Sequence, residues 1–178
     1  MKIEYQIIRS GRRTLAIQIT AHGQVLVRSP YGASDRSIAD FVKRKESWIA
    51  KHLQKTPAVD PLTPEQVKQL KKQAALVLTE RTAYYADLLG VSYGRITIRC
   101  QKTRWGSCSA KGNLNFNCLL MLAPPQVADY VVIHELCHRK EMNHSQRFWD
   151  AVLKLCPDHT QCRKWLKTNG PALIARLP

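Results

Sequence analysis

The residue types that could carry chemistry gather in one short stretch, residues 134–148. His134 and His138 stand four positions apart, so a helix would project both imidazoles from one face, as two ligands of a single zinc ion require. Glu135 follows His134 directly, where its carboxylate can reach a water held on the metal. His144 supplies a candidate third nitrogen ligand. Three protein ligands leave one position for water, so the pattern predicts a catalytic zinc site of the hydrolase type.

The groups around this site are less sharply defined. His159 is an alternative third ligand, because the helix expected after Pro157 could pack against the site. Cys108 is an alternative fourth ligand in a latent form of the site. Carboxylates that could orient the imidazoles are those of Asp129, Glu141 and Asp150. Candidates for stabilising an oxyanion are Tyr130, Arg104 and Arg147.

Local signals predict the elements that position the motif. Apolar residues at helical spacing favour a helix from near Gln126 to Met142. Asn143 tolerates the left-handed conformation, so it is expected to end this helix and to return His144 toward the metal. Ser145 is expected to cap the next helix.

An alternating run over residues 113–120 predicts a strand before the metal helix. Its apolar residues share one face, and Asn113, Asn115 and Asn117 share the other. An amide-rich strand could be an open edge to which an extended peptide adds as a strand, which makes these asparagines candidate substrate-binding residues. The alternative is a half-buried strand with its asparagines in solvent.

The N-terminal third has a different pattern. Short alternating segments at residues 2–9, 13–20 and 24–28, separated by turn signals, predict an antiparallel β-meander. Ser34 is expected to cap a helix that runs to about Gln54. The proline-containing segment 55–64 is expected to be a linker.

Beyond the linker, Thr63, Pro64 and Gln66 form a strong helix start with a capping box. This helix is expected to run to Leu89 and to stop at Gly90. A strand is expected at residues 95–100.

Composition bounds the possible classes. The 178 residues suffice for one good core with a small second subdomain, and no apolar run is long enough to span a membrane. The first ten residues have no secretory apolar region. The six cysteines form no C-x-x-C pair, which favours reduced thiols and a cytoplasmic location. The net charge of +15 is compatible with a nucleic-acid or nucleotide partner, or with a solvated basic surface.

Three sequence blocks together resemble a known family. They are Arg-Trp-Gly-Ser-Cys at 104–108, Gly-Asn-Leu-Asn-Phe at 112–116, and the histidine motif with Asn-His-Ser at 143–145 and Phe-Trp at 148–149. In these blocks the chain resembles the YgjP-like metallopeptidases, which are related to the SprT-like and WLM zinc proteases. The N-terminal segment fits the same family, so the resemblance covers nearly the whole chain.

The resemblance implies a zincin-like catalytic region in which His134, His138 and His144 bind zinc and Glu135 acts as the general base. We therefore expect an α+β fold, with a metal helix packed on a small sheet and an N-terminal β-meander and helix. The expected domains are residues 1–56 and 57–178. The expected function is a zinc metallopeptidase acting on a peptide or protein. The alternatives are a nucleoside triphosphate pyrophosphohydrolase on the same metal, and a DNA-associated protease or binding module.

Overall fold

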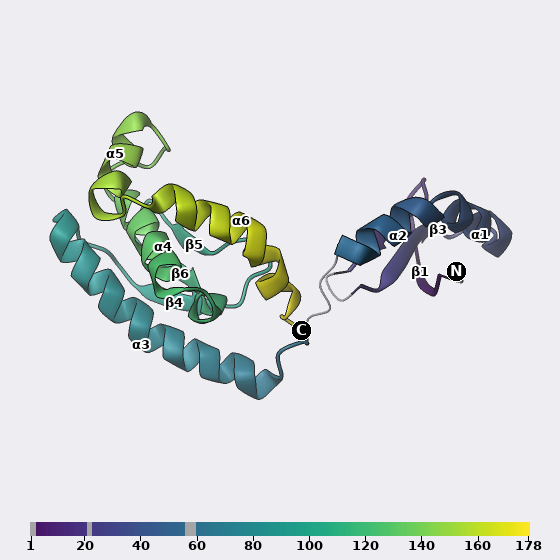
Figure 1. The fold of residues 1–178 in the computed structure, drawn as a ribbon, viewed down its shortest axis with the longest axis horizontal. Coiled ribbons are helices and arrows are strands. Elements are labelled where there is room, and N and C mark those ends of the chain that lie inside the picture. The colour runs from purple at the N-terminus through teal and green to yellow at the C-terminus, as the bar shows by residue number, and fades with distance from the viewer. Residues whose placement is uncertain (1–2, 21–22, 56–59) are drawn as a thin grey trace. The chain divides into compact units, whose positions relative to one another are not determined.

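The computed structural model describes residues 3–20, 23–55 and 60–178. The chain divides into two compact units, Met1–Pro61 and Leu62–Pro178, and each contains one three-stranded sheet (Figure 1). The mixed α and β composition expected from the sequence is confirmed. The expected domain boundary, between residues 56 and 57, lies outside the described residues. In the described ranges, none of the helices has the length and apolarity to cross a bilayer.

The sheet of the N-terminal unit has its third strand in the middle. β3 pairs in parallel with β1 and antiparallel with β2. The expected antiparallel meander is therefore wrong, because a meander would place β2 at the centre. Val25 and Val27 of β3 are buried, whereas most of β1 is exposed, so the strand with the most buried apolar surface takes the central place. The strands are β1 (Tyr5–Ser10), β2 (Ala16–Ile19) and β3 (Val25–Pro30).

The helical part of this unit is two helices, α1 (Asp35–Arg44) and α2 (Glu46–Lys55), where the sequence predicted one. Ser34 caps α1 as expected, accepting a hydrogen bond from the Ser37 N–H at 3.2 Å. Lys45 interrupts the helix: its backbone N–H donates to the carbonyls of Val42 and Lys43 and so ends α1. Buried residues of both helices join one core with those of β3, so the interruption leaves the buried face intact.

The larger unit begins with α3 (Pro64–Leu89), whose ends were predicted correctly. The Thr63 N–H donates to Gln66 Oε1 at 2.9 Å, and the Gln66 N–H donates to Thr63 Oγ1 at 3.2 Å. Gly90 ends the helix in the left-handed conformation, with φ of 62°, which a residue with a side chain rarely adopts.

The second sheet repeats the strand order of the first. Its middle strand, β6, pairs in parallel with β4 and antiparallel with β5. The expectation that the asparagine-rich strand is an open edge is wrong, because strands flank it on both sides. The alternation also ends early, since a short 3-10 helix, η1, follows Asn117 directly. The elements are β4 (Ile96–Arg99), β5 (Gly106–Cys108), β6 (Leu114–Asn117) and η1 (Cys118–Leu122).

Three helices complete the unit: α4 (Pro125–Cys137), α5 (Gln146–Leu155) and α6 (His159–Ala175). α4 packs against the sheet, and α3 and α6 are also in contact with α4 (Figure 1). It ends at Cys137, five residues before the expected end. Among the described residues, positive φ occurs only at glycines, so Asn143 turns the chain without a left-handed backbone. Its Oδ1 accepts a hydrogen bond from the Ser145 N–H at 3.1 Å, and Ser145 caps α5 as expected.

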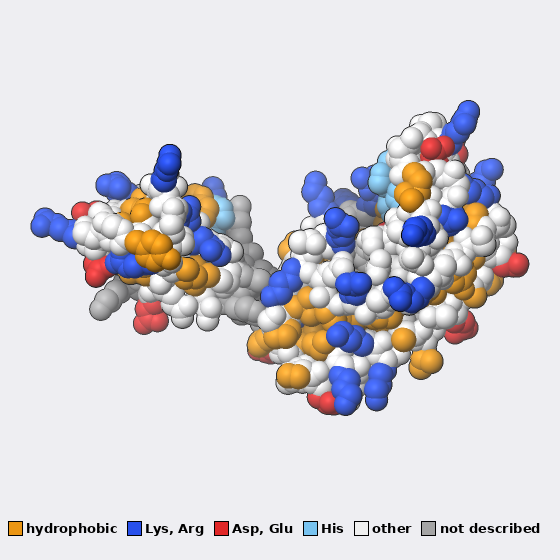
Figure 2. Space-filling view, turned by 180° about the vertical axis from the view of Figure 1, so that it is seen from behind, with side chains coloured by type: hydrophobic (Ala, Val, Ile, Leu, Met, Phe, Trp, Pro, Cys, Tyr) orange, Lys and Arg blue, Asp and Glu red, His pale blue; other side chains and the backbone are white. Residues whose placement is uncertain are grey.

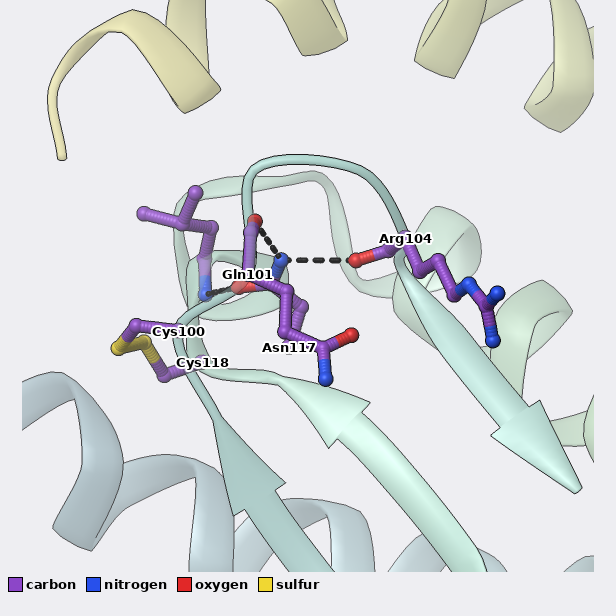
Figure 3. The surroundings of a disulfide bond; sticks show 6 residues. Cys100, Gln101, Arg104, Asn117 and Cys118 are labelled. Atoms are coloured by element: carbon purple, nitrogen blue, oxygen red, sulfur yellow. Dashed lines mark hydrogen bonds between the residues drawn. A yellow bond between two sulfur atoms is a disulfide. The ribbon is translucent and has the colours of Figure 1, made fainter.

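A disulfide joins Cys100, after β4, to Cys118, after β6. The expectation of reduced thiols is wrong for this pair; the other four cysteines are free. The cytoplasmic location inferred from reduced thiols stays a prediction. Beside the disulfide, the buried Asn117 amide donates to the carbonyls of Gln101 at 2.8 Å and Arg104 at 2.9 Å (Figure 3). These contacts hold the loop that leads from the disulfide to β5.

Asn117→Ala should lower the free energy of unfolding by about 2–4 kcal/mol, because it leaves two carbonyls and the Leu119 N–H without their side-chain partner. Asn115→Ala, on the same strand, is the matched control. Its amide is less buried and makes two hydrogen bonds, so the loss should be smaller. Urea unfolding measures both, and equal losses would contradict the role given to Asn117.

Candidate metal centre

The C-terminal end of α4 and the turn that follows it bring three histidines together. His134 and His138 project from successive turns at the end of α4, and His144 returns from the turn just before the Ser145 cap. One ligand atom from each lies within 4.8 Å of the others. Figure 2 shows histidine side chains at the surface of the larger unit, with Lys and Arg side chains around them. The structure thus groups the three histidines that the sequence singled out.

The nitrogen geometry suits one shared ion. Nε2 of His134 and Nε2 of His144 are 3.1 Å apart. Two nitrogens bound to one tetrahedral zinc at about 2.05 Å would lie about 3.3 Å apart. His138 Nδ1 is 3.2 Å from the Glu141 carbonyl, which can only accept, so Nδ1 carries the proton and Nε2 is free to bind a metal. Three Nε2 atoms are thereby available to a single ion.

Phe148 supports all three imidazoles. It is completely buried, and its ring centroid lies 4.9 Å from that of His134, 4.6 Å from that of His138 and 4.7 Å from that of His144. One rigid aromatic ring therefore restricts the rotation of every candidate ligand. Sequence reasoning placed Phe148 on a helix without a role, because helical spacing alone does not show which rings meet it.

Burial favours the uncharged form of two candidate ligands, His134 and His138. It lowers the pKa of His134 to about 3, with further lowering by the charges of His138, His144 and Arg163. Burial also lowers the pKa of His138. A neutral imidazole is the metal-binding form, so at neutral pH these two residues need lose no proton to coordinate an ion.

Glu135 is buried where α4 packs against β5. Its side chain is buried, and the backbone N–H of Cys108 donates to its carboxylate. Burial raises the pKa of Glu135 to about 8, while the Cys108 N–H and the positive charge of Arg104 act in the other direction. A carboxyl group with a pKa near neutrality is suited to both accept and donate a proton during turnover.

Gly106 of β5 makes the close approach of Glu135 possible. A Cβ atom at this position would lie 2.6 Å from Glu135 Oε1 and 2.7 Å from its Cγ. Gly106 belongs to one of the blocks that carry the family resemblance, but the sequence did not reveal its partner. Only the packing of β5 against α4 shows why a side chain is excluded here.

The two competing ligands lie outside the three-histidine group. His159 stacks on Trp149, with ring centroids 5.6 Å apart, and its buried Nδ1 has no hydrogen-bond partner in the described part of the chain. The Cys108 thiol donates weakly to the Ser109 carbonyl at 3.5 Å. Cys108 contacts the candidate site through its backbone N–H, which donates to the Glu135 carboxylate.

The expected orienting carboxylates act elsewhere. Asp129 pairs with Arg81 through two hydrogen bonds of 2.6 and 2.7 Å, and Asp150 accepts from Gln146 at 2.9 Å. Glu141 meets His138 through its backbone carbonyl. The nitrogens of His138 and His134 that face away from the shared position therefore meet the Glu141 carbonyl and the Tyr130 hydroxyl, and the hydroxyl lies 3.5 Å from His134 Nδ1.

The candidate substrate-binding asparagines are engaged within the protein. Asn113 Oδ1 accepts from the Arg95 N–H at 3.0 Å, and Asn115 donates to Ser107 Oγ at 3.1 Å. Asn117 holds the loop before β5, as described above. Their contact with substrate stays a prediction, and the edge strands of this sheet are β4 and β5.

Three histidines around a shared position, with a buried glutamate next to His134 in the sequence, form an arrangement typical of metal-dependent hydrolases. The model of the YgjP-like metallopeptidase domain matches residues 13–70 and 67–169. The chain belongs to this family, as its sequence blocks indicated.

Two solved structures are similar to part of the chain. One is the metallopeptidase zymogen of Pyrococcus abyssi abylysin, with 26% identity and a TM-score of 0.46, over 51% of this chain and 93% of that one. The other is the metallopeptidase zymogen of Methanocaldococcus jannaschii jannalysin, with 20% identity and a TM-score of 0.43, over 51% and 95%. Among curated proteins, no sequence matches the chain.

Gly106→Ala should reduce hydrolytic turnover by about 100-fold while metal content is retained, because the new methyl group displaces Glu135 without touching the histidines. Gly32→Ala is the control, since a Cβ there meets nothing within 4 Å. Turnover and bound metal are measured on the same preparations. Loss of metal together with turnover would contradict this separation.

In metal-free protein, Glu135→Gln should be more stabilising at pH 8 than at pH 5. The pKa of Glu135 is 4.5 in the unfolded chain and about 8 in the folded protein, so wild-type stability contributed by this group falls as the pH rises through that window. The glutamine variant lacks this loss. Effects of His134 are present in both proteins and cancel in the difference. Urea unfolding in the presence of a chelator, at several pH values, measures the free energy of unfolding of both proteins. If the difference between the two proteins did not change with pH, the buried, protonated state of Glu135 would be contradicted.

Proposed function

We propose that this protein is a zinc peptidase, with His134, His138 and His144 as the zinc ligands and Glu135 as the general base. The convergence of one nitrogen from each of three histidines, with a buried glutamate of raised pKa next to His134 in the sequence, carries the proposal. We assign the hydrolase activity to the expected catalytic region, residues 57–178.

Each residue has a distinct task. A zinc ion held by His134, His138 and His144 would supply Lewis acidity at this position. Glu135 accepts the proton of the attacking water and delivers it to the leaving amine. The Cys108 N–H and the charge of Arg104 favour the ionised form of Glu135, in which it can act as a base. Phe148 holds the imidazoles in register for a single ion.

The edge strand beside Glu135 favours a peptide as substrate. β5 is paired with β6 on one side only, and its residues pack against the helix that carries Glu135. An extended peptide can add to such an edge through main-chain hydrogen bonds, which would bring a backbone carbonyl close to the metal.

Metal content tests the ligand assignment. Wild-type protein supplied with zinc should hold about one ion per chain, and His134→Ala or His144→Ala should lose it. His159→Ala should keep it, because this ring lies outside the three-histidine group. Elemental analysis after dialysis gives the ratio. Retention by His144→Ala together with loss by His159→Ala would reverse the choice of third ligand.

Turnover tests the reaction. Glu135→Gln should keep its zinc and lose peptide cleavage, measured on quenched-fluorescent peptide libraries. Pyrophosphate release from nucleoside triphosphates and cleavage of proteins in the presence of DNA are run alongside, because these are the competing uses of the site. A zinc-loaded wild type that releases pyrophosphate and leaves every peptide intact would overturn the peptidase proposal.

A further inference from the structure

Trp149 links the metal centre to an arginine that the proposed reaction does not use. Its ring stacks on His144, with centroids 5.7 Å apart and planes at 27°, and its centroid is 6.0 Å from that of His134. The guanidinium carbon of Arg163, on α6, lies over the same ring at 4.7 Å from the centroid. His134, His144 and Arg163 therefore all lie against the ring of Trp149.

Arg163 has no carboxylate partner in the part of the chain that the structure describes. Its side chain is exposed, and the ring of Trp149 is the contact it makes. A cation–π contact uses the charge of the guanidinium and none of its N–H groups as hydrogen-bond donors. The contact with Trp149 therefore leaves these donors free, whereas an ion pair would occupy them.

The charge of Arg163 reaches the site. It is one of the causes that lower the pKa of His134, and it also acts on the buried Tyr130. Arg104 acts on Glu135 in the same way, from the loop before β5. Arg163 and Arg104 thus bring positive charge to two sides of the candidate metal site, where an incoming carboxylate would be attracted.

We propose that Arg163, held on Trp149, binds a carboxylate of the peptide substrate next to the bond that is cleaved, and so makes the enzyme selective for acidic peptides. The inference rests on the proposed peptidase function and names its substrate class. A planar guanidinium binds a carboxylate through two parallel hydrogen bonds, so it recognises both charge and shape. Arg163 is a specificity residue here and takes no part in proton transfer.

Binding to an inactive protein tests the proposal apart from turnover. The background is zinc-loaded Glu135→Gln, and the probes are short fluorescein-labelled peptides that carry one Glu, or one Gln at the same position, with an amidated C-terminus. At one position the Glu peptide should bind about tenfold more tightly than its Gln twin, as measured by fluorescence anisotropy. Adding Arg163→Gln should abolish this preference and leave the affinity for the Gln twin unchanged.

The matched control is Lys164→Gln in the same background. It removes one positive charge from the neighbouring position of α6, where the structure shows no contact with Trp149. This control should keep the tenfold preference. An equal loss with Lys164→Gln would assign the effect to general charge and would overturn the proposal. Weaker binding of both twins by Arg163→Gln would also overturn it, since that result indicates a structural or oxyanion-stabilising role.

Two sources of the carboxylate are separated by a further pair of probes. A peptide with a free C-terminus and its amidated twin, both without Glu, report on a terminal carboxylate; the Glu scan reports on an acidic side chain. The outcomes also separate the proposed selectivity from the proposed peptidase function. If wild type binds and cleaves peptides without any carboxylate preference, only the role of Arg163 is overturned. If the zinc-loaded protein binds no peptide, both proposals are overturned.

Discussion

The burial of the apolar side chains of α4 by the surrounding elements determines how the larger unit is arranged. The helix contacts α3, β5, η1, α5 and α6, and most of its side chains are buried. A helix covered in this way can carry polar groups at low cost only where the cover ends or where a partner meets them. His134 and His138 stand at its C-terminal end, where the chain turns outward. The position of the candidate metal centre is therefore a consequence of how α4 is packed.

The same packing gives Glu135 its chemical character. A carboxyl group removed from water is a stronger base than one in solvent, because its ionised form has lost hydration. One backbone N–H and the charge of a nearby arginine offset part of that loss, so the ionised form stays accessible near neutrality. Burial acts on His134 and His138 in the opposite sense: it lowers their pKa values, so both imidazoles stay neutral, which is the form that binds a metal. One apolar environment thus prepares both kinds of group.

Local sequence signals correctly predicted helix caps and helix ends, which depend on neighbouring residues. They did not predict strand order, which depends on contacts between distant segments. The caps at Ser34, Thr63 and Ser145 and the stop at Gly90 are confirmed, because each depends on side chains a few positions away. The histidine spacing likewise identified the residues that converge. Strand order did not follow from alternation, which assigns side chains to faces and carries no information on which strand is central.

The features missed in the site have the same origin. Gly106 and Phe148 act through contacts with residues that are tens of positions away or on another helix. Asn117 looked like one of three equivalent amides, but the chain leaves the sheet at that residue and buries it against a loop. The disulfide joins cysteines 18 positions apart, and only the parallel pairing of β4 with β6 brings them together.

The strand order shared by the two sheets constrains how this chain can fold as it is synthesised. In each unit the central strand is the last of the three to leave the ribosome. The earlier strands have no pairing partner in their own sheet until it arrives, so neither sheet can form stepwise from adjacent hairpins. A chain interrupted before β6 would present β4 and β5 as two unpaired strands, with exposed edges open to pairing with other molecules. Completion of β6 is thus the event that lets β4 and β5 of the larger unit pair within one sheet.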